Sequence, residues 1–204
     1  MKNIKYLAAC ALAFTLALVS CEDETLSPYL EPEAGAHAFG ELEKDGKFDE
    51  SDIPGSSVDV ALRWVSVDKK VKIDKIELYV NFLEEYVDKD GNPAVAVHGG
   101  KTGVLLPTSL SGLENRTPGN VNITAAQVYQ LFKDAKFKYD GATEVAVFGN
   151  PTNPRPTNAQ FLPGDSFSLT WRLYSADGKV YKSWSPSVCT ELRGANCSVD
   201  WFVE

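Results

Sequence analysis

The feature that most constrains this chain is an alternation of apolar with polar or small residues along three short segments, residues 58–64, 76–82 and 167–173. The alternating apolar positions are Val58, Val60, Leu62, Trp64, Ile76, Leu78, Val80, Phe82, Phe167, Leu169, Trp171 and Leu173. A period of two places successive side chains on opposite faces of a β-strand. Each strand would therefore bury one face and expose the other, as in antiparallel rather than parallel sheets. The pattern predicts an all-β fold, an antiparallel β-sandwich.

Turn-forming residues separate further segments of the same kind. Asp177-Gly178 precedes residues 180–184, and an Asp-Gly pair between two strands is a strong hairpin signal. Residues 88–93, DKDGNP, predict a second turn, and residues 199–203 predict a last strand.

One short helix is predicted between the strands. Thr124 is a good N-cap, and Gln127, three residues later, completes a capping box. Apolar residues recur at i, i+3, i+4 and i+7 from Val128 to Ala135. This single apolar stripe would pack against an edge or end of the sandwich.

The N-terminus has the organisation of a secretory signal peptide. Lys2 and Lys5 precede residues 6–19, an apolar run without charge. Its length of about 14 residues is too short for a membrane-spanning helix, which needs roughly 20. A buried core helix, the alternative, would have a polar face at helical spacing, and this run has none.

The segment Leu18-Val19-Ser20-Cys21 resembles the lipobox of bacterial lipoproteins. The resemblance implies that the Cys21 sulfur carries a diacylglycerol and that cleavage makes Cys21 the first residue of the mature chain. The resemblance also allows acylation of its amine, and two or three acyl chains form a stable membrane anchor. The predicted organisation is a signal peptide at residues 1–20, a lipidated tether at 21–36 and a folded domain at 37–204.

Three acids, Glu22, Asp23 and Glu24, follow Cys21 directly. Such a cluster resembles the surface-export signal of Bacteroidota lipoproteins, which implies an outer-membrane protein that faces the cell exterior. The alternative is a solvated tether, since acidic segments that contain proline resist packing. The two interpretations are compatible, because a tether must be flexible on either side of the membrane.

The folded part is acidic and long enough for a hydrophobic core. Removal of the signal peptide leaves 18 basic and 28 acidic residues, a net charge of −10. This balance argues against a nucleic-acid partner and against a polybasic membrane patch. About 170 residues suit one domain, or at most two small subdomains.

Cys189 and Cys197 are the two cysteines left once the signal peptide is removed and Cys21 is lipidated. They flank a short polar segment, in a compartment where disulfides persist. We predict a Cys189–Cys197 disulfide, and two free thiols are the alternative. No metal site is expected, because it would need further ligands and the chain has only His37 and His98.

Motifs for catalysis are missing from the sequence, which has no G-x-S-x-G, H-E-x-x-H or phosphate-binding G-x-x-x-x-G-K. His37 lies at the tether and His98 in a predicted loop. Glu84-Glu85 could form the carboxylate pair of a glycoside hydrolase, but we expect a solvated strand end instead. No enzymatic activity and no cofactor are predicted.

Aromatic residues are the better candidates for ligand binding, because sugars and peptides stack on flat apolar rings. Three tryptophans share the register of the apolar core positions: Trp64, Trp171 and Trp201. Trp184 lies at the end of the predicted hairpin and is the first candidate, with a rim residue that caps the sandwich as the alternative. Tyr79 and Tyr174 lie on predicted solvent-exposed faces and are weaker candidates.

The folded part resembles the small lipoproteins that accompany SusC/SusD-type uptake systems of Bacteroidota. The resemblance rests on the lipobox with its acids, on IDKIELYVNF at residues 73–82, on the Thr-capped helix and on LPGDSFSLTWRLYSADGKVY at residues 162–181. It spans most of residues 58–184 and implies an immunoglobulin-like or fibronectin-like sandwich. The tail with its two cysteines departs from the pattern, so no ligand class is implied.

Together these features predict a non-catalytic, lipid-anchored surface protein that binds or helps to capture a glycan or another nutrient. Its implied partners are the membrane, a SusC/SusD-type complex and a glycan or peptide ligand. One alternative is a structural or adhesive, fimbrillin-like subunit, although the tether has no arginine for proteolytic processing. A hydrolase is the other alternative, but the sequence has none of the catalytic motifs named above.

Overall fold

The computed structural model describes residues 34–44, 46–150, 154–155, 161–190 and 196–204. The predicted signal peptide, the predicted lipidation site Cys21 and the acids Glu22, Asp23 and Glu24 lie outside these residues. The part from Ala34 to Glu204 forms one unit, built mostly of β-strands. None of its described helices is long and apolar enough to cross a membrane.

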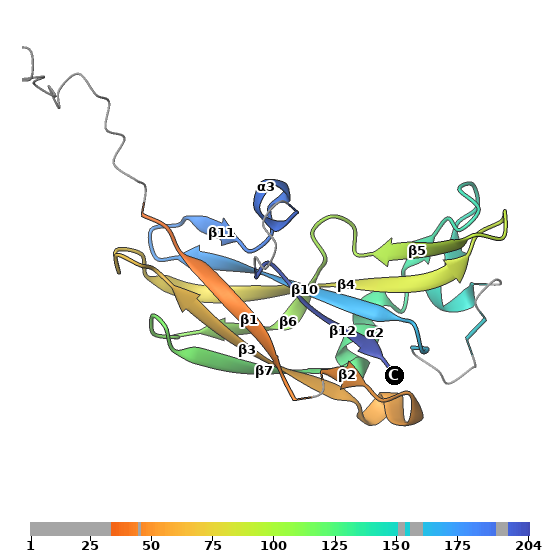
Figure 1. Ribbon diagram of the computed structural model, residues 1–204, viewed down its shortest axis with the longest axis horizontal. Coiled ribbons are helices and arrows are strands. Elements are labelled where there is room, and N and C mark those ends of the chain that lie inside the picture. The colour runs from red at the N-terminus through yellow and green to blue at the C-terminus, as the bar shows by residue number, and fades with distance from the viewer. Residues whose placement is uncertain (1–33, 45, 151–153, 156–160, 191–195) are drawn as a thin grey trace, which may run out of the picture. The chain divides into compact units, whose positions relative to one another are not determined.

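The strands of the described residues form two large sheets and a short ribbon (Figure 1). The first sheet has the order β1-β3-β7, with β1 at His37–Glu43, β3 at Ser57–Val65 and β7 at Pro118–Thr124. The second has the order β2-β12-β10-β4-β5, at Lys47–Phe48, Val199–Val203, Ser166–Ser175, Ile73–Val87 and Pro93–His98. Two more strands join it: β11 (Val180–Lys182) pairs with β10, and β6 (Val104–Ser111) pairs with β4. The ribbon consists of β8 (Lys136–Phe137) and β9 (Val145–Ala146).

The pairing is antiparallel throughout the described strands except between β2 and β12. Short helices connect the strands: η1 (Glu50–Gly55), α2 (Ala125–Phe132), η2 (Val147–Gly149) and α3 (Pro186–Cys189). The all-β prediction is therefore confirmed.

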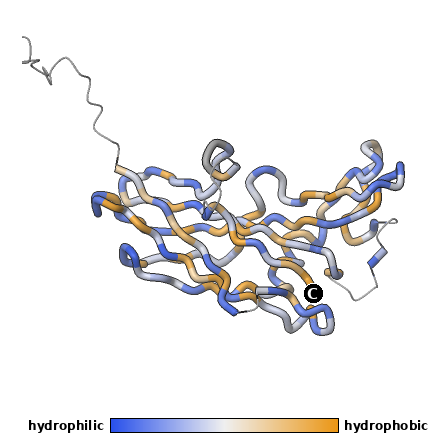
Figure 2. Tube along the Cα trace, viewed as in Figure 1, coloured by the Kyte–Doolittle hydropathy of each residue, from blue (hydrophilic) through white to orange (hydrophobic). Residues whose placement is uncertain are grey.

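The two large sheets share one hydrophobic core. Each of the twelve alternating apolar residues is at most 3% exposed, so the predicted buried faces are confirmed. Figure 2 shows the same alternation as short hydrophobic and hydrophilic stretches along the strands. The sheets approach each other closely at Gly40, where a Cβ atom would lie 2.7 Å from the Trp171 ring. The Trp171 indole N–H donates to the Ala38 carbonyl at 3.2 Å and so bonds the second sheet to the first.

The predicted helix is confirmed with its capping box. The Thr124 hydroxyl accepts from the Gln127 N–H, and the Gln127 side chain accepts from the Thr124 N–H, both at 3.1 Å. Val128 and Phe132 are buried in the core. The helix ends at Phe132, before Ala135, although Ala135 still packs against the core.

The predicted turns have the expected backbone chemistry. Gly178 has φ +84° between β10 and β11, a conformation that favours glycine. In the turn between β4 and β5, the Asp88 carboxylate accepts from the N–H groups of Asp90 and Asn92 at 2.9 and 2.8 Å. Both hairpins therefore form where the turn residues predict them.

The predicted disulfide is also confirmed. Cys189, the last residue of α3, is bonded to Cys197, and their Cα atoms lie 6.0 Å apart. The bond connects α3 to the segment that enters β12. The chain reversal expected at Gly194 lies outside the described residues.

Three expectations about polar residues are wrong. Glu84 is not solvated but 0% exposed, although its neighbour Glu85 is exposed. His98 is not in a loop; it is the last residue of β5 and is 4% exposed. His37 begins β1, opposite Val65, and so belongs to the first sheet rather than to a tether.

Candidate functional site

The candidate site is a groove of about 730 Å³ on the outer face of the second sheet. Its floor comes from β4 and β10, and α3 and the loop between β5 and β6 flank it. Figure 1 shows α3 and this loop rising on the same side of the sheet. The lining residues are Asn81, Leu83, Val97, Gly100, Lys101, Thr102, Ser168, Thr170, Trp171, Arg172, Lys182, Ser183, Trp184 and Pro186.

The floor follows from the period of the strands. Residues between the buried positions of β4 and β10 point away from the core, because successive side chains of a strand face opposite ways. Asn81 lies opposite Ser168 in the pairing of these strands. Thr170 and Arg172 continue the row along β10. The floor therefore presents hydroxyl, amide and guanidinium groups on a flat backbone.

The loop between β5 and β6 is held in place from below. The Asn81 side-chain amide donates to the carbonyls of His98, at 3.2 Å, and Gly100, at 2.8 Å. Gly103 has φ +72°, and a Cβ there would lie 3.0 Å from the Asn81 amide oxygen. Glycine at this position thus allows the close approach that fixes the loop over the sheet.

The opposite wall carries Trp184, whose side chain is 46% exposed. The residue before it, Ser183, is buried: its N–H donates to the Trp171 carbonyl at 2.9 Å, and its hydroxyl accepts from the Trp171 N–H at 3.0 Å. The Ser185 N–H donates to Cys189 Sγ at 3.1 Å. Because Cys189 is bonded to Cys197, the disulfide fixes the wall next to Trp184.

Tyr79 and Tyr174 do not line the groove but support its floor from one side. Arg172 lies over the Tyr79 ring, 4.2 Å from its centroid. The Tyr79 hydroxyl donates to the Glu77 carboxylate at 2.7 Å, and Lys75 donates to the same carboxylate at 2.7 Å. These bonds order the side chains beside the groove.

The same hydrogen bonds explain the ionisation of Glu77 and Tyr79. Hydrogen bonds to Glu77 from Lys75, Tyr174 and Tyr79 lower the pKa of Glu77 to about 2. Burial, followed by the hydrogen bond to Glu77, raises the pKa of Tyr79 above its ordinary value. Glu77 therefore stays charged and Tyr79 neutral at physiological pH.

Two other grooves differ in chemistry. One, of about 510 Å³, is lined by Asp74 and Glu114 and reaches Trp64, which is only 3% exposed. The other, of about 770 Å³, lies on the first sheet and includes Glu41 and Glu43. The groove at Trp184 combines a half-exposed tryptophan with a lining free of carboxylates, and it is the best candidate for ligand binding.

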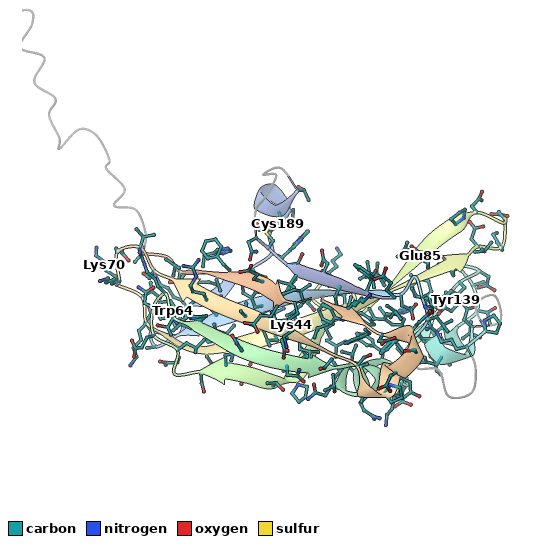
Figure 3. The ribbon with its side chains drawn as sticks, turned by 60° about the horizontal axis from the view of Figure 1, so that its bottom comes forward. Lys44, Trp64, Lys70, Glu85, Tyr139 and Cys189 are labelled. Carbon is teal, nitrogen blue, oxygen red and sulfur yellow. A yellow bond between two sulfur atoms is a disulfide. The ribbon has the colours of Figure 1, made fainter. Side chains whose placement is uncertain are left out.

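A second polar assembly lies inside the domain, around the carboxylate of Glu84. The Glu84 carboxylate accepts from the Tyr139 hydroxyl at 2.5 Å, contacts His98 Nε2 at 3.0 Å and pairs with Arg155 at 3.2 Å. Arg155 also binds Asp165 through two nitrogens, at 2.6 and 3.0 Å. Figure 3 shows Tyr139 at the end of the domain that also carries Glu85, away from Trp64 and Lys70.

This buried charge cluster is structural. Burial alone would raise the pKa of Glu84, but hydrogen bonds from His98 and Tyr139 and the charge of Arg155 hold it below its usual value. The side chains of Glu84 and Arg155 are 0% and 1% exposed, so no substrate reaches them in this arrangement. Glu84 and His98 do not line the groove.

A sequence signal for this cluster exists. Glu84 follows Phe82 by two residues and so continues the buried face of β4. His98 follows the buried Ala96 by two residues on β5 in the same way. The partner Arg155 could not be found from a pattern, because the sequence around it, rich in proline and asparagine, has neither a strand nor a helix period.

Of the residues predicted to bind a ligand, only Trp184 lines the groove. The cations Lys101, Arg172 and Lys182 were not among the predicted site residues, yet they line it too. Among the described residues, no group of three or more His, Cys, Asp or Glu side chains is placed to hold a metal ion.

Comparison with known proteins adds no relative to these observations. The chain matches no protein-family model, and no curated protein was found to be similar to it.

Proposed function

We propose that this protein is a lipid-anchored, non-catalytic binding protein of the cell surface that captures a glycan. The observation that carries the proposal is the groove at Trp184, where a half-exposed indole stands beside the polar side chains of β4 and β10. A sugar ring has an apolar face that stacks on an indole and hydroxyl groups at its edge. The hydroxyls of Ser168 and Thr170 offer hydrogen bonds to such groups.

The form of the groove supports an extended ligand. Its walls are fixed before binding, one by Asn81 and the other by the disulfide, so little ordering entropy is lost when a ligand enters. Since the groove is open rather than enclosed, a chain of several sugar units fits better than a small, fully buried molecule.

The cellular context of the proposal comes from the N-terminal sequence. Lipidation of Cys21 and the acids Glu22, Asp23 and Glu24 would attach the domain to the outer membrane and direct it to the exterior. The resemblance to lipoproteins of SusC/SusD-type systems favours a role in nutrient uptake, with such a complex as the partner.

The immunoglobulin-like or fibronectin-like identity of the sandwich is part of the same proposal. Its support is the strand order, β1-β3-β7 in one sheet and β12-β10-β4-β6 in the other. In immunoglobulin-like domains the strands A, B and E likewise share one sheet, and G, F and C share the other. Along the chain, β1, β3, β4, β7, β10 and β12 follow one another in the same order as the strands A, B, C, E, F and G.

The test is binding of purified mature domain to a panel of soluble polysaccharides by affinity electrophoresis. We expect Trp184→Ala to weaken retardation by the best ligand at least about tenfold, which corresponds to about 1.4 kcal/mol. Phe202→Ala is the matched control, because Phe202 is 49% exposed on β12 and does not line the groove. Equal loss in both variants, or no retardation of the wild type by any polysaccharide, would contradict the proposal.

A further inference from the structure

The charge of the groove is opposite to the charge of the protein. Its lining includes three cations, Lys101, Arg172 and Lys182, and no aspartate or glutamate. The chain as a whole carries 28 acidic and 20 basic residues, a net charge of −8. A local excess of cations on an acidic protein needs a specific reason, because the summed field of the other charges does not favour an anion there.

Two of these cations are placed against each other. Arg172 on β10 is paired in register with Lys182 on β11. Residues directly opposite in an antiparallel pair have Cβ atoms roughly 4.5–5.5 Å apart, and like charges in this position are destabilising. The two side chains therefore leave the same face of neighbouring strands, so an anion bound above these strands would contact both.

Within the part of the chain that the structure describes, Lys101, Arg172 and Lys182 form no ion pair. Glu77 is the other cross-strand neighbour of Arg172, but its carboxylate is bonded to Lys75 and Tyr79.

Contacts on the neighbouring strands define the surroundings of these cations. The Arg172 guanidinium lies over the Tyr79 ring of β4, 4.2 Å from its centroid, which orders this side chain at the groove. Two acids lie next to the floor in the strand pairing, Glu77 opposite Arg172 and Asp200 opposite Ser168, and neither lines the groove. The basic end of the groove is thus the end near β11, where Trp184 also lies.

We propose that the groove binds an anionic glycan, a sugar chain with carboxylate or sulfate groups. A sugar ring stacks on Trp184, and the acidic substituents pair with Arg172, Lys182 and Lys101. A planar guanidinium matches the geometry of both anions. This inference rests on the proposed function and names the class of its ligand. The acidic surface of the protein outside the groove disfavours nucleic acid, whose binding depends on many phosphate contacts.

The test uses isothermal titration of the mature domain with four probes: oligogalacturonate, dextran sulfate, neutral dextran and a single-stranded DNA oligonucleotide. We expect at least one anionic glycan to bind at least tenfold more tightly than dextran, and its affinity to fall between 50 and 300 mM salt. The two anionic glycans distinguish carboxylate from sulfate as the recognised group.

Three variants connect the binding to the groove. Lys182→Gln should weaken the anionic probe threefold to tenfold, and Arg172→Gln should weaken it at least as much. Lys70→Gln is the matched control: Lys70 is exposed and does not line the groove, and it should change the affinity less than twofold. Lys182 is exposed at a strand end, so its variant is expected to fold even where Arg172→Gln is destabilised; melting curves monitor both.

The outcomes separate the two proposals. If a neutral polysaccharide binds as tightly as the anionic probes and Trp184→Ala abolishes binding, the groove binds glycans but this inference is wrong. If Lys182→Gln and Lys70→Gln have equal effects, the inference is also wrong. If no polysaccharide binds, both proposals fail. Tighter binding of a single-stranded DNA oligonucleotide, lost in Lys182→Gln, would overturn the glycan in favour of nucleic acid.

Discussion

The residue with the largest expected effect on stability is Arg155, because it balances two buried carboxylates. It pairs with Glu84 at 3.2 Å and with Asp165 at 2.6 Å, and its side chain is 1% exposed. Removal of one partner from a buried ion pair leaves an uncompensated charge in a poorly solvated site. At this position one substitution would leave two such charges.

We expect Arg155→Met to lower the free energy of unfolding by about 3–5 kcal/mol, measured by urea denaturation at pH 7. Arg63→Met is the control, because Arg63 is an exposed residue of β3 and should cost less than about 1 kcal/mol. If the two variants lose the same free energy of unfolding, the stability of the cluster around Glu84 does not depend on the Arg155 guanidinium.

Glu77 gives a prediction about pH. Its pKa is about 2 in the folded protein, below its usual value of 4.5, because of the hydrogen bonds from Lys75, Tyr174 and Tyr79. A lowered pKa stabilises the folded state above the usual value, and this contribution is lost as pH falls through the folded pKa. The relevant window therefore extends from about pH 4.5 down to about pH 2.

We expect Glu77→Gln to be about 1–2 kcal/mol less stable than the wild type at pH 7, with the two proteins converging as the pH falls through this window. Denaturation curves at a series of pH values measure the difference. Glu144→Gln, at an exposed position, should run parallel to the wild type throughout. A constant difference between Glu77→Gln and the wild type from pH 7 to pH 2 would contradict the role of these hydrogen bonds.

At the scale of elements, the disulfide joins α3 to the entry of β12. The bond closes a loop with a sequence separation of 8, and loop entropy of this size corresponds to about 2–3 kcal/mol. The disulfide is not the only attachment of β12 to the core, since β12 also pairs with β10 over four register partners. The sandwich should therefore persist without it.

The double variant Cys189→Ser with Cys197→Ser should lower the melting temperature by about 5–10 °C while the far-UV circular dichroism at 25 °C stays unchanged. It should also weaken ligand binding at Trp184, because α3 forms part of that wall. A thiol count on denatured, unreduced wild type provides the check. Two free thiols there would contradict the bond and with it the explanation of the wall.

At the scale of the whole molecule, we propose that the N-terminal segment gives the folded domain its place in the cell. We expect Cys21→Ala to abolish labelling by a fatty-acid analogue and to leave the protein soluble or unprocessed. Cys189→Ser with Cys197→Ser is the control and should still be labelled. A Cys21→Ala protein that still labels and still sediments with membranes would show that Cys21 is not the lipidated residue.

The acids after Cys21 are tested separately from the anchor. Replacement of Glu22, Asp23 and Glu24 by alanine should keep the lipid label and protect the protein from protease added to whole cells. The export signal would then be the cause of exposure. If protease still cleaves the variant on intact cells, the acids serve only as a solvated tether.

The sequence by itself determined the elements whose causes are local. Alternation with a period of two sets which face of a strand can be buried, and this holds for Val58, Phe82 and Trp171 alike, whatever strand lies beside them. The capping box at Thr124 and the disulfide were also predictable, because each joins residues close together in the chain.

The tertiary structure alone decided which distant segments meet. The groove combines Asn81 of β4, Arg172 of β10, Lys101 of a loop and Trp184 near α3, and no local pattern states that these strands are neighbours. The burial of Glu84 could not be predicted from the sequence either, because its position in the strand period predicts burial and its charge predicts exposure. Burial prevails because folding brings Arg155, His98 and Tyr139 to the carboxylate, and their hydrogen bonds and charge offset the cost of removing it from water.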